Sequence, residues 1–370
     1  MTADISDRFG MPTNSFDPDE PSTGSTQGND TTEGTTGFSL SRRQTIRTGG
    51  LLGAGGLLGL AGVGTDTAAA NSGNPDEIIH LDYDAHDDWE ELYRVSNGDP
   101  ENLGFVSSPT VSGSTALEMR FQEGDNWGVS THYDFEDGLL ELNGRVSFSL
   151  GSDWTMDDRE LAVCRLWNCA IARGEGSAGG GDPDGTNGWS NRMYVSTRDT
   201  DPEGPYHLLS NTYHMDGGDE EYGDHDYIVD GEEYALAQPE IVPGQWYEFE
   251  YYVRVNTVSG GEPNADGVVR YWLDGDPVYE RENFRFTTDR TDNAVDTTGP
   301  VGHYGGSYTA PTTLYAYYDD HSMALGGTFG SDDGSETDDD SGTDDDSGTD
   351  GSETPESESD SDASDSDTCP

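Results

Sequence analysis

Lysine is absent from the 370-residue chain: all 17 basic residues are arginine, against 75 acidic residues, and the formal net charge is −58. Such a chain has no basic stripe that could neutralise phosphates, which excludes a nucleic-acid partner. In dilute buffer this charge would repel itself, but in molar salt the Debye length falls to about 3 Å and screens the repulsion. The composition therefore predicts a halophilic protein of a very salty environment.

Long hydrophobic runs are also missing. The most apolar stretch, residues 49–63, is dense in glycine and shorter than the roughly 20 apolar residues that span a membrane. Arg42 and Arg43 precede it and Ala68–Ala70 follows it, which resembles a twin-arginine signal peptide over residues 39–70. A short membrane anchor is the alternative. We expect a protein that is secreted to the extracellular medium by the twin-arginine pathway and meets a membrane only during export.

Cysteine occurs only three times. Cys164 and Cys169 could form a disulfide if the chain turns between them; if the segment is extended, they face opposite ways and stay free. Two cysteines at this spacing, without a further His or Cys pair, match no common zinc pattern, so no metal is expected there. Cys369 has no partner in its local sequence.

Hydrophobic residues make up only 31% of the chain, and part of the deficit lies in its ends. Residues 1–38 are rich in Gly, Thr, Asp and Ser, and residues 329–370 are an acidic tail that repeats Thr-Asp-Asp-Asp-Ser-Gly. Neither segment can bury a core, so both are predicted to be disordered. Residues 76–328 remain as one domain.

Short alternating apolar and polar runs recur in this domain, at 116–121, 144–150, 246–255, 268–280 and 314–325. An Asp-Gly pair inside the fourth run predicts a tight hairpin turn. Strands of this length between Gly- and Asp-rich turns predict an all-β fold, an antiparallel β-sandwich of the jelly-roll, concanavalin-like type.

Four stretches together resemble polysaccharide lyase family 14, the alginate and glucuronan lyases with a jelly-roll fold. They are Cys164–Asn168, Gly188–Tyr194 with the glycine-rich loop Gly179–Gly185 before it, Asn211–His214, and a C-terminal series from Gly244 to Asp320. The resemblance implies a lyase that cleaves a uronate-containing polymer by β-elimination. Two positions depart from the family pattern, since Arg165 stands at its catalytic lysine and Asn211 at the first tyrosine of its Tyr-x-Tyr-His. An arginine keeps its proton at all working pH values, so proton transfer at that position is in doubt.

The resemblance and the chemistry together suggest roles for individual residues. A lyase must neutralise the uronate carboxylate before the C5 proton can leave, and an arginine fork suits that task. Arg192 and Arg165 are the candidates, assisted by Ser190. Tyr213 is the candidate acid and base, with its pKa lowered by a nearby arginine, and His132 is a second base. Alternatively, Arg192 pairs with a surface acid and Tyr213 is a rim or core aromatic residue.

Four further residues are candidates for substrate binding: Trp189, Asn191, Asn211 and His214. His214 follows Tyr213 directly and would face the other side of a strand, which favours a structural role. Residues two apart share a face, so Ser190 and Arg192 lie together, as do Asn211 and Tyr213.

The expected partner is an acidic polysaccharide, and the protein is expected to be a monomer without a cofactor. Asp319 and Asp320 could hold a structural Ca²⁺, with solvated carboxylates as the alternative. A non-catalytic carbohydrate-binding or cell-surface module is the competing function. A glycoside hydrolase ranks last, because the sequence has no E-x-D-x-x-E signature for the two carboxylates it needs.

Overall fold

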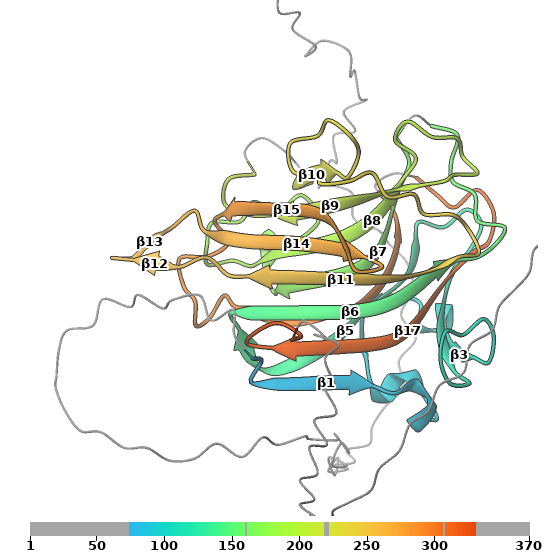
Figure 1. Ribbon diagram of the computed structural model, residues 1–370, viewed down its shortest axis with the longest axis horizontal. Helices are drawn as coiled ribbons and strands as arrows, with labels where there is room; N and C mark the ends of the chain where they lie inside the picture. The colour runs from blue at the N-terminus through green and yellow to red at the C-terminus, as the bar shows by residue number, and fades with distance from the viewer. Residues whose placement is uncertain (1–73, 160, 218–221, 306–307, 331–370) are drawn as a thin grey trace, which may run out of the picture. The chain divides into compact units, whose positions relative to one another are not determined.

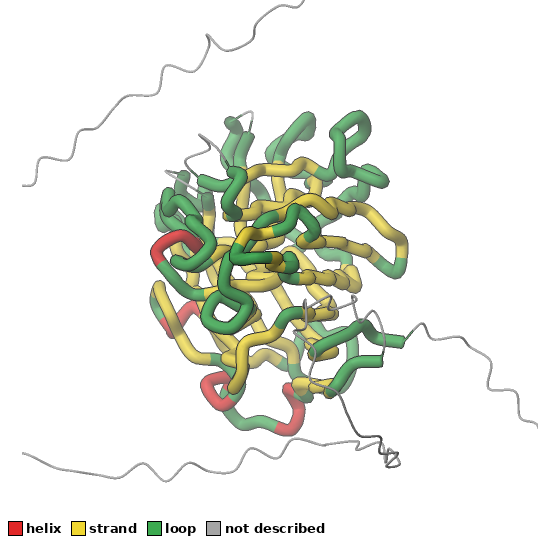
Figure 2. Tube along the Cα trace, turned by 90° about the vertical axis from the view of Figure 1, so that its left-hand side faces the viewer, coloured by secondary structure: helices red, strands yellow, loops and turns green. Residues whose placement is uncertain are grey.

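The computed structural model describes residues 74–330 except 160, 218–221 and 306–307. Nearly all regular structure in this part is antiparallel β-strand (Figure 1, Figure 2). The helices described are four short 3-10 turns, η1 Tyr83–Ala85, η2 Trp89–Glu91, η3 Pro100–Asn102 and η4 Glu175–Ser177. None of these helices has the length and apolar character to cross a membrane. The twin-arginine segment and both predicted tails fall outside the described residues, except for 329 and 330.

Two sheets make up the domain. The eight-stranded sheet has the order β15-β14-β11-β6-β17-β4-β3, with β1 beside β17. Its strands are β1 Glu77–Leu81, β3 Leu103–Val106, β4 Ala116–Phe121, β6 Glu141–Leu150, β11 Trp246–Arg254, β14 Gly267–Leu273, β15 Asp276–Phe284 and β17 Leu314–Leu325.

The seven-stranded sheet has the order β10-β9-β8-β7-β16-β5-β2 and lies behind the first in Figure 1. Its strands are β2 Arg94–Gly98, β5 Trp127–Leu139, β7 Val163–Ala172, β8 Trp189–Ser196, β9 His207–Tyr213, β10 Asp224–Tyr227 and β16 Val295–Tyr304. A small separate hairpin joins β12 Val258–Ser259 to β13 Glu262–Pro263. The prediction of an antiparallel jelly-roll sandwich is confirmed. The strands of both large sheets pair antiparallel, and neighbours such as β6 and β17 are far apart in sequence, as the crossing connections of a jelly roll require.

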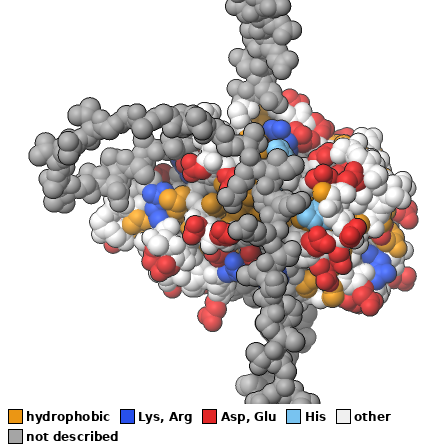
Figure 3. All heavy atoms as spheres, turned by 90° about the horizontal axis from the view of Figure 1, so that it is seen from below, with side chains coloured by type: hydrophobic (Ala, Val, Ile, Leu, Met, Phe, Trp, Pro, Cys, Tyr) orange, Lys and Arg blue, Asp and Glu red, His pale blue; other side chains and the backbone are white. Residues whose placement is uncertain are grey.

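The core follows from the alternation in the sequence. In β4, Leu117, Met119 and Phe121 are buried, while Glu118 and Arg120 between them are partly exposed. Residues two apart share a face, so one face of each strand supplies the core. Burying each such apolar side chain contributes roughly 1.5–3 kcal/mol. Outside the core, Figure 3 shows carboxylates spread over one surface of the molecule, with arginines among them.

The Asp-Gly turn lies between β14 and β15 as predicted. Asp274 and Gly275 have φ of 52° and 82°, the left-handed values that a two-residue hairpin loop needs and that Asp-Gly adopts readily.

The cysteine segment is extended, so the disulfide alternative does not apply: Cys164 and Cys169 are both free. The expectation that they face opposite ways is wrong, because both are buried in the core. The register of β7 against β8 shifts after Arg165 and again after Asn168. A β-bulge inserts an extra residue and changes which side chains share a face, so Cys169 reaches the same side as Cys164.

Asp319 lies within β17, where its carboxylate accepts hydrogen bonds from the backbone amides of Val111 and Ser112. Burial raises the pKa of this carboxyl group. No group of three or more His, Cys, Asp or Glu that could hold a metal ion occurs in the part of the chain that the structure describes.

Candidate active site

Neighbouring strands bring the predicted Ser-x-Arg and Asn-x-Tyr pairs together. In the β8–β9 register, Ser190 is opposite Tyr213 and Arg192 is opposite Asn211. Directly opposed residues of an antiparallel pair point to the same face. These four side chains therefore share the face of the seven-stranded sheet that points away from the other sheet.

The two bulges in β7 add a third strand to this face. They leave Arg165 opposite Tyr194 and Asn168 opposite Arg192. Bulges often re-aim side chains near functional sites. The face at the centre of the seven-stranded sheet, which we call the arginine face, thus carries Arg165, Asn168, Ser190, Arg192, Tyr194, Asn211 and Tyr213.

Arg192 is the most buried charge on the arginine face, with 2% of its surface exposed. Its guanidinium donates to the carbonyl oxygen of Ser177 over 2.5 Å and to the hydroxyl of Ser190, which itself donates to the same carbonyl. Burial, with the nearby positive charge of Arg165, lowers the pKa of Arg192 to about 9. Burying an unpaired charge is costly, so this site favours an anion.

No carboxylate pairs with Arg192 or Arg165 among the described residues. Other arginines do find partners there, such as Arg94 with Asp134 and Arg281 with Asp224. The charges of Arg165 and Arg192 are close enough to act on each other, and neither has a carboxylate partner in the described chain although the sequence holds 75 acidic residues. The positive charge on the arginine face therefore has no carboxylate counterion within the described chain.

Two buried donors on this face also lack partners. Arg192 Nε and Asn168 Nδ2 have no hydrogen-bond acceptor within the described structure. A buried donor without a partner costs about 1–3 kcal/mol, more when it is charged. Arg192 and Asn168 are directly opposed in β8 and β7, so the two donors without partners belong to neighbouring residues.

Tyr194 belongs to this site, and sequence reasoning missed it. Arg165 Nε donates to its phenolic oxygen over 2.8 Å, and the same guanidinium lies 5.3 Å from the ring centroid. The phenol in turn donates to Asn211 Oδ1 over 3.4 Å. Extending the period of two from Ser190 and Arg192 to the next residue on that face would have found it.

Tyr213 stands beside Arg192, whose guanidinium carbon lies 5.3 Å from the ring centroid. The expectation that the pKa of Tyr213 is lowered overall is wrong. Burial raises the pKa of Tyr213, and Arg192 offsets burial only in part. The phenol is therefore held in its protonated form.

Two histidines border the arginine face. Burial, aided by Arg94, lowers the pKa of His132 to about 4, and its Nδ1 lies 3.2 Å from Arg94 Nη2. His303, which the sequence did not single out, has its pKa lowered to about 3 by burial and by Arg165. Its ring packs 4.1 Å from the ring of Trp127. Both imidazoles are neutral at ordinary pH.

Trp189 and Asn191 do not reach the arginine face. Trp189 is fully buried, donates to the Asn293 carbonyl and stacks on Phe286. Asn191 donates to Ser210 and Thr212 inside the sandwich. We therefore leave both out of the substrate contacts proposed below.

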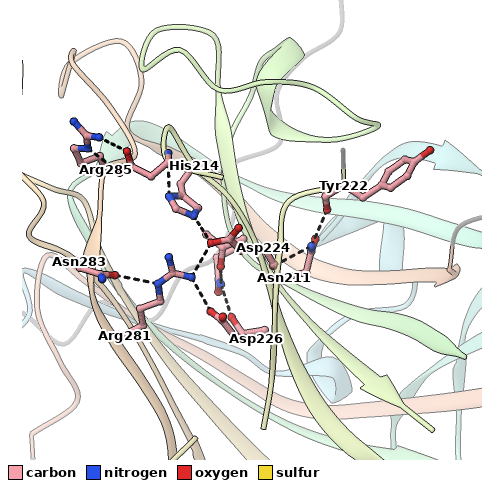
Figure 4. A network of polar contacts seen from close by, with 12 residues as sticks. Asn211, His214, Tyr222, Asp224, Asp226, Arg281, Asn283 and Arg285 are labelled. Atoms are coloured by element: carbon pink, nitrogen blue, oxygen red, sulfur yellow. Dashed lines mark hydrogen bonds and ion pairs between the residues drawn. The ribbon is translucent and has the colours of Figure 1, made fainter. Parts of the chain in front are cut away.

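His214 belongs to a different cluster, shown in Figure 4. Its Nε2 lies 2.7 Å from Asp224, and Arg281 Nη1 donates to Asp224 over 2.8 Å and to Asp226 over 3.0 Å. These contacts join β9 and β10 of one sheet to β15 of the other. Because His214 Nδ1 accepts from the Asp216 amide, both ring nitrogens have partners within the protein. The side-chain amide of Asn211 donates to the backbone carbonyl of Tyr222, which lies between β9 and β10 (Figure 4).

Comparison with known proteins gives fold likenesses at low identity. No family model matches the chain, and no curated protein matches it. Among solved structures, alginate lyase Aly36B, a mutant in complex with alginate trisaccharide, is 19% identical over 67% of this chain and 98% of its own, with a TM-score of 0.49.

Two other solved structures are similar. A PL-14 alginate lyase from Aplysia kurodai is 15% identical over 65% of this chain and 90% of its own, with a TM-score of 0.45. An endo-β-1,4-glucuronan lyase from Trichoderma reesei is 14% identical over 69% of this chain and 100% of its own, with a TM-score of 0.40. Likenesses of this size do not show what this chain acts on.

Proposed function

We propose that this protein is a secreted polysaccharide lyase that cleaves a uronate-containing polymer of the alginate or glucuronan type by β-elimination. One observation carries the proposal: Arg192 is buried beside Arg165, and neither has a carboxylate partner in the described chain, although 75 acidic residues are present. A uronate carboxylate is the counterion that this arrangement suits.

The carboxylate would be held by the partnerless donors. Arg192 Nε and Asn168 Nδ2 would each donate to it, as a charge-assisted and a neutral hydrogen bond. Neutralising the carboxylate makes the C5 proton beside it more acidic, and the effect grows as negative charge develops on the carboxylate in the transition state. Ser190 and the Ser177 carbonyl hold the Arg192 fork in place, so they act as positioning groups.

Tyr213 suits the acid that protonates the leaving O4. Its raised pKa keeps the phenol protonated, and a general acid must carry its proton when the C4–O4 bond breaks. Its ring lies against Arg192, so an acid at this position is next to the sugar whose carboxylate Arg192 holds.

Secretion is part of the same proposal. It rests on the twin-arginine pattern in residues 39–70 and on the acidic composition, both of which suit a folded protein exported into strong salt.

A non-catalytic carbohydrate-binding module is the second candidate. It is favoured by Arg165 at the position where the family resemblance expects a lysine. Such a module would bind a uronate polymer through Arg192 and leave it intact.

One assay separates the two candidates. Purified protein in molar salt is incubated with alginate, with polyglucuronate and with a neutral glucan, and ultraviolet absorbance follows the conjugated double bond of an unsaturated uronate. A lyase forms this product from a uronate polymer and not from the glucan. Binding of a uronate polymer without product identifies the module instead.

A further inference from the structure

We propose that Tyr194, held by Arg165, is the base that takes the C5 proton. This deepens the lyase function proposed above and rests on it. Tyr194 was not among the candidates from the sequence, and Arg165 would serve here as the donor that holds its phenolic oxygen.

The contact between Arg165 and Tyr194 is the starting observation. Arg165 Nε donates to the phenolic oxygen over 2.8 Å, so a permanent positive charge lies against the atom that would accept the proton. The hydrogen bond that the phenol donates to Asn211 is long, at 3.4 Å, and is therefore weak. A guanidinium at this distance stabilises negative charge on the oxygen as a charge-assisted partner.

Tyr194 and Tyr213 lie on opposite sides of Arg192. Tyr194 is two residues beyond Arg192 along β8, whereas Tyr213 is opposite Ser190, two residues before it. A sugar whose carboxylate meets Arg192 thus has one phenol on each side. This arrangement separates the base at C5 from the acid at O4, two roles that a single residue would otherwise have to fill in turn.

Arg165 itself cannot be the base, because a guanidinium keeps its proton. The only hydroxyl to which Arg165 donates, among the contacts in the described chain, is that of Tyr194. Arg165 would therefore act through Tyr194, whose phenolic oxygen accepts its hydrogen bond. The pair Arg165–Tyr194 would do together what one titratable amine does alone.

The histidines on the border suit the role less well. The pKa of His132 is about 4 and that of His303 about 3, so neither has much affinity for a proton taken from carbon. His132 also has its Nδ1 against Arg94. The Nδ1 of His303 is buried without a partner among the described residues.

The step balances as follows. The Tyr194 phenolate takes the C5 proton and becomes a phenol, the C5–H electron pair forms the C4=C5 double bond, and the C4–O4 bond breaks. O4 takes the proton of the Tyr213 phenol and leaves as a hydroxyl, and Tyr213 becomes a phenolate. Exchange with water returns a proton to Tyr213 and removes one from Tyr194, so no other reactant is needed.

The test compares two phenol deletions in the full chain. Tyr194→Phe and Tyr213→Phe should each lower kcat at least about 100-fold, the usual effect of removing a general acid or base, with little change in KM. Tyr252→Phe is the matched control, because its ring also packs on an arginine, Arg270 at 6.0 Å, but on β11 of the eight-stranded sheet. This control should keep the activity of the unmodified protein.

Proton exchange in heavy water then assigns the roles. Tyr213→Phe, which keeps the base, should introduce deuterium at C5 of the uncleaved polymer, and Tyr194→Phe should not. Retained cleavage or retained C5 exchange in Tyr194→Phe, or loss of exchange in Tyr213→Phe as well, overturns the assignment. If the unmodified protein forms no unsaturated product from any uronate polymer, the lyase proposal itself has failed, and this outcome is distinct from the others.

Discussion

Asn168 and Arg192 are directly opposed in β7 and β8, and each keeps a buried N–H group without an acceptor in the described chain. The two donors come from residues 24 positions apart whose strands the fold places side by side. Unsatisfied donors in a core are normally selected against because each costs stability. The presence of both donors on neighbouring residues is explained if a substrate carboxylate completes the site.

Asn168→Asp tests this by supplying the missing carboxylate from within the protein. The new charge would pair with Arg192, so we expect the melting temperature to rise. Lyase activity should fall at least about 100-fold, because an internal carboxylate competes with the substrate for the same guanidinium. Thermal unfolding and product formation measure the two effects.

The matched control is Asn143→Asp on β6. Asn143 donates to Glu250, so a carboxylate there meets a like charge and should lower the melting temperature while leaving catalysis intact. A fall in melting temperature for Asn168→Asp of similar size to that control would mean that Arg192 does not lack a counterion.

The cluster of Figure 4 predicts a pH-dependent stability. Burial alone would raise the pKa of Asp224, but its hydrogen bonds with His214 and Arg281 outweigh burial and hold that pKa below its ordinary value. A lowered folded-state pKa gives stability that is present above the unfolded pKa of about 3.9 and is lost as pH falls through the folded value.

Asp224→Asn should therefore cost about 2 kcal/mol of unfolding free energy at neutral pH, as expected for hydrogen bonds to a charged group, and much less in acid. Denaturant unfolding at the two pH values measures this. Asp216→Asn is the control, since its pair with Arg285 is partly exposed and worth about 0–1 kcal/mol. Equal losses for the two variants at neutral pH would show that the Asp224 contacts stabilise the fold no more than a partly exposed ion pair does.

Salt dependence follows from the net charge of −58. Removing molar salt lengthens the range of carboxylate repulsion, so the melting temperature should fall steeply. A neutral osmolyte at matched osmolality serves as control, since it screens no charge. Melting curves that coincide in low and high salt would contradict the halophilic interpretation.

Export can be tested on the sequence outside the described residues. Replacing Arg42 and Arg43 by lysine keeps both charges but removes the twin-arginine pair. Protein in the medium should then fall while protein in the cells is retained. Replacing Arg47 by lysine is the control and should leave secretion unchanged; undiminished secretion of the double variant would exclude the twin-arginine route.

The sequence predicted the fold well where the signal is local. The alternation in Ala116–Phe121 matches a strand residue for residue, and the Asp274–Gly275 turn lies where expected. The same period of two placed Ser190 with Arg192 and Asn211 with Tyr213. That β8 and β9 are neighbours is a long-range property that alternation does not reveal.

Other parts of the site depended on features that no local pattern shows. Two bulges in β7 put Cys169 in the core and Asn168 beside Arg192. The residues of β7 do not alternate between apolar and polar, so a period of two does not locate the extra residues. His303 comes from β16, far along the chain. The sign of the Tyr213 pKa shift depends on burial, which requires the packed fold.

The most direct test of the central claim is the effect of Arg192→Gln on the cleavage of a uronate polymer, measured as kcat/KM from the ultraviolet absorbance of the unsaturated product in molar salt. Arg270→Gln, on the other sheet and paired with Glu280, controls for the loss of one positive charge. If Arg192 neutralises the substrate carboxylate, kcat/KM falls by about 10²–10³-fold in Arg192→Gln and stays unchanged in Arg270→Gln. A folded Arg192→Gln protein with the kcat/KM of the unmodified chain would contradict the account.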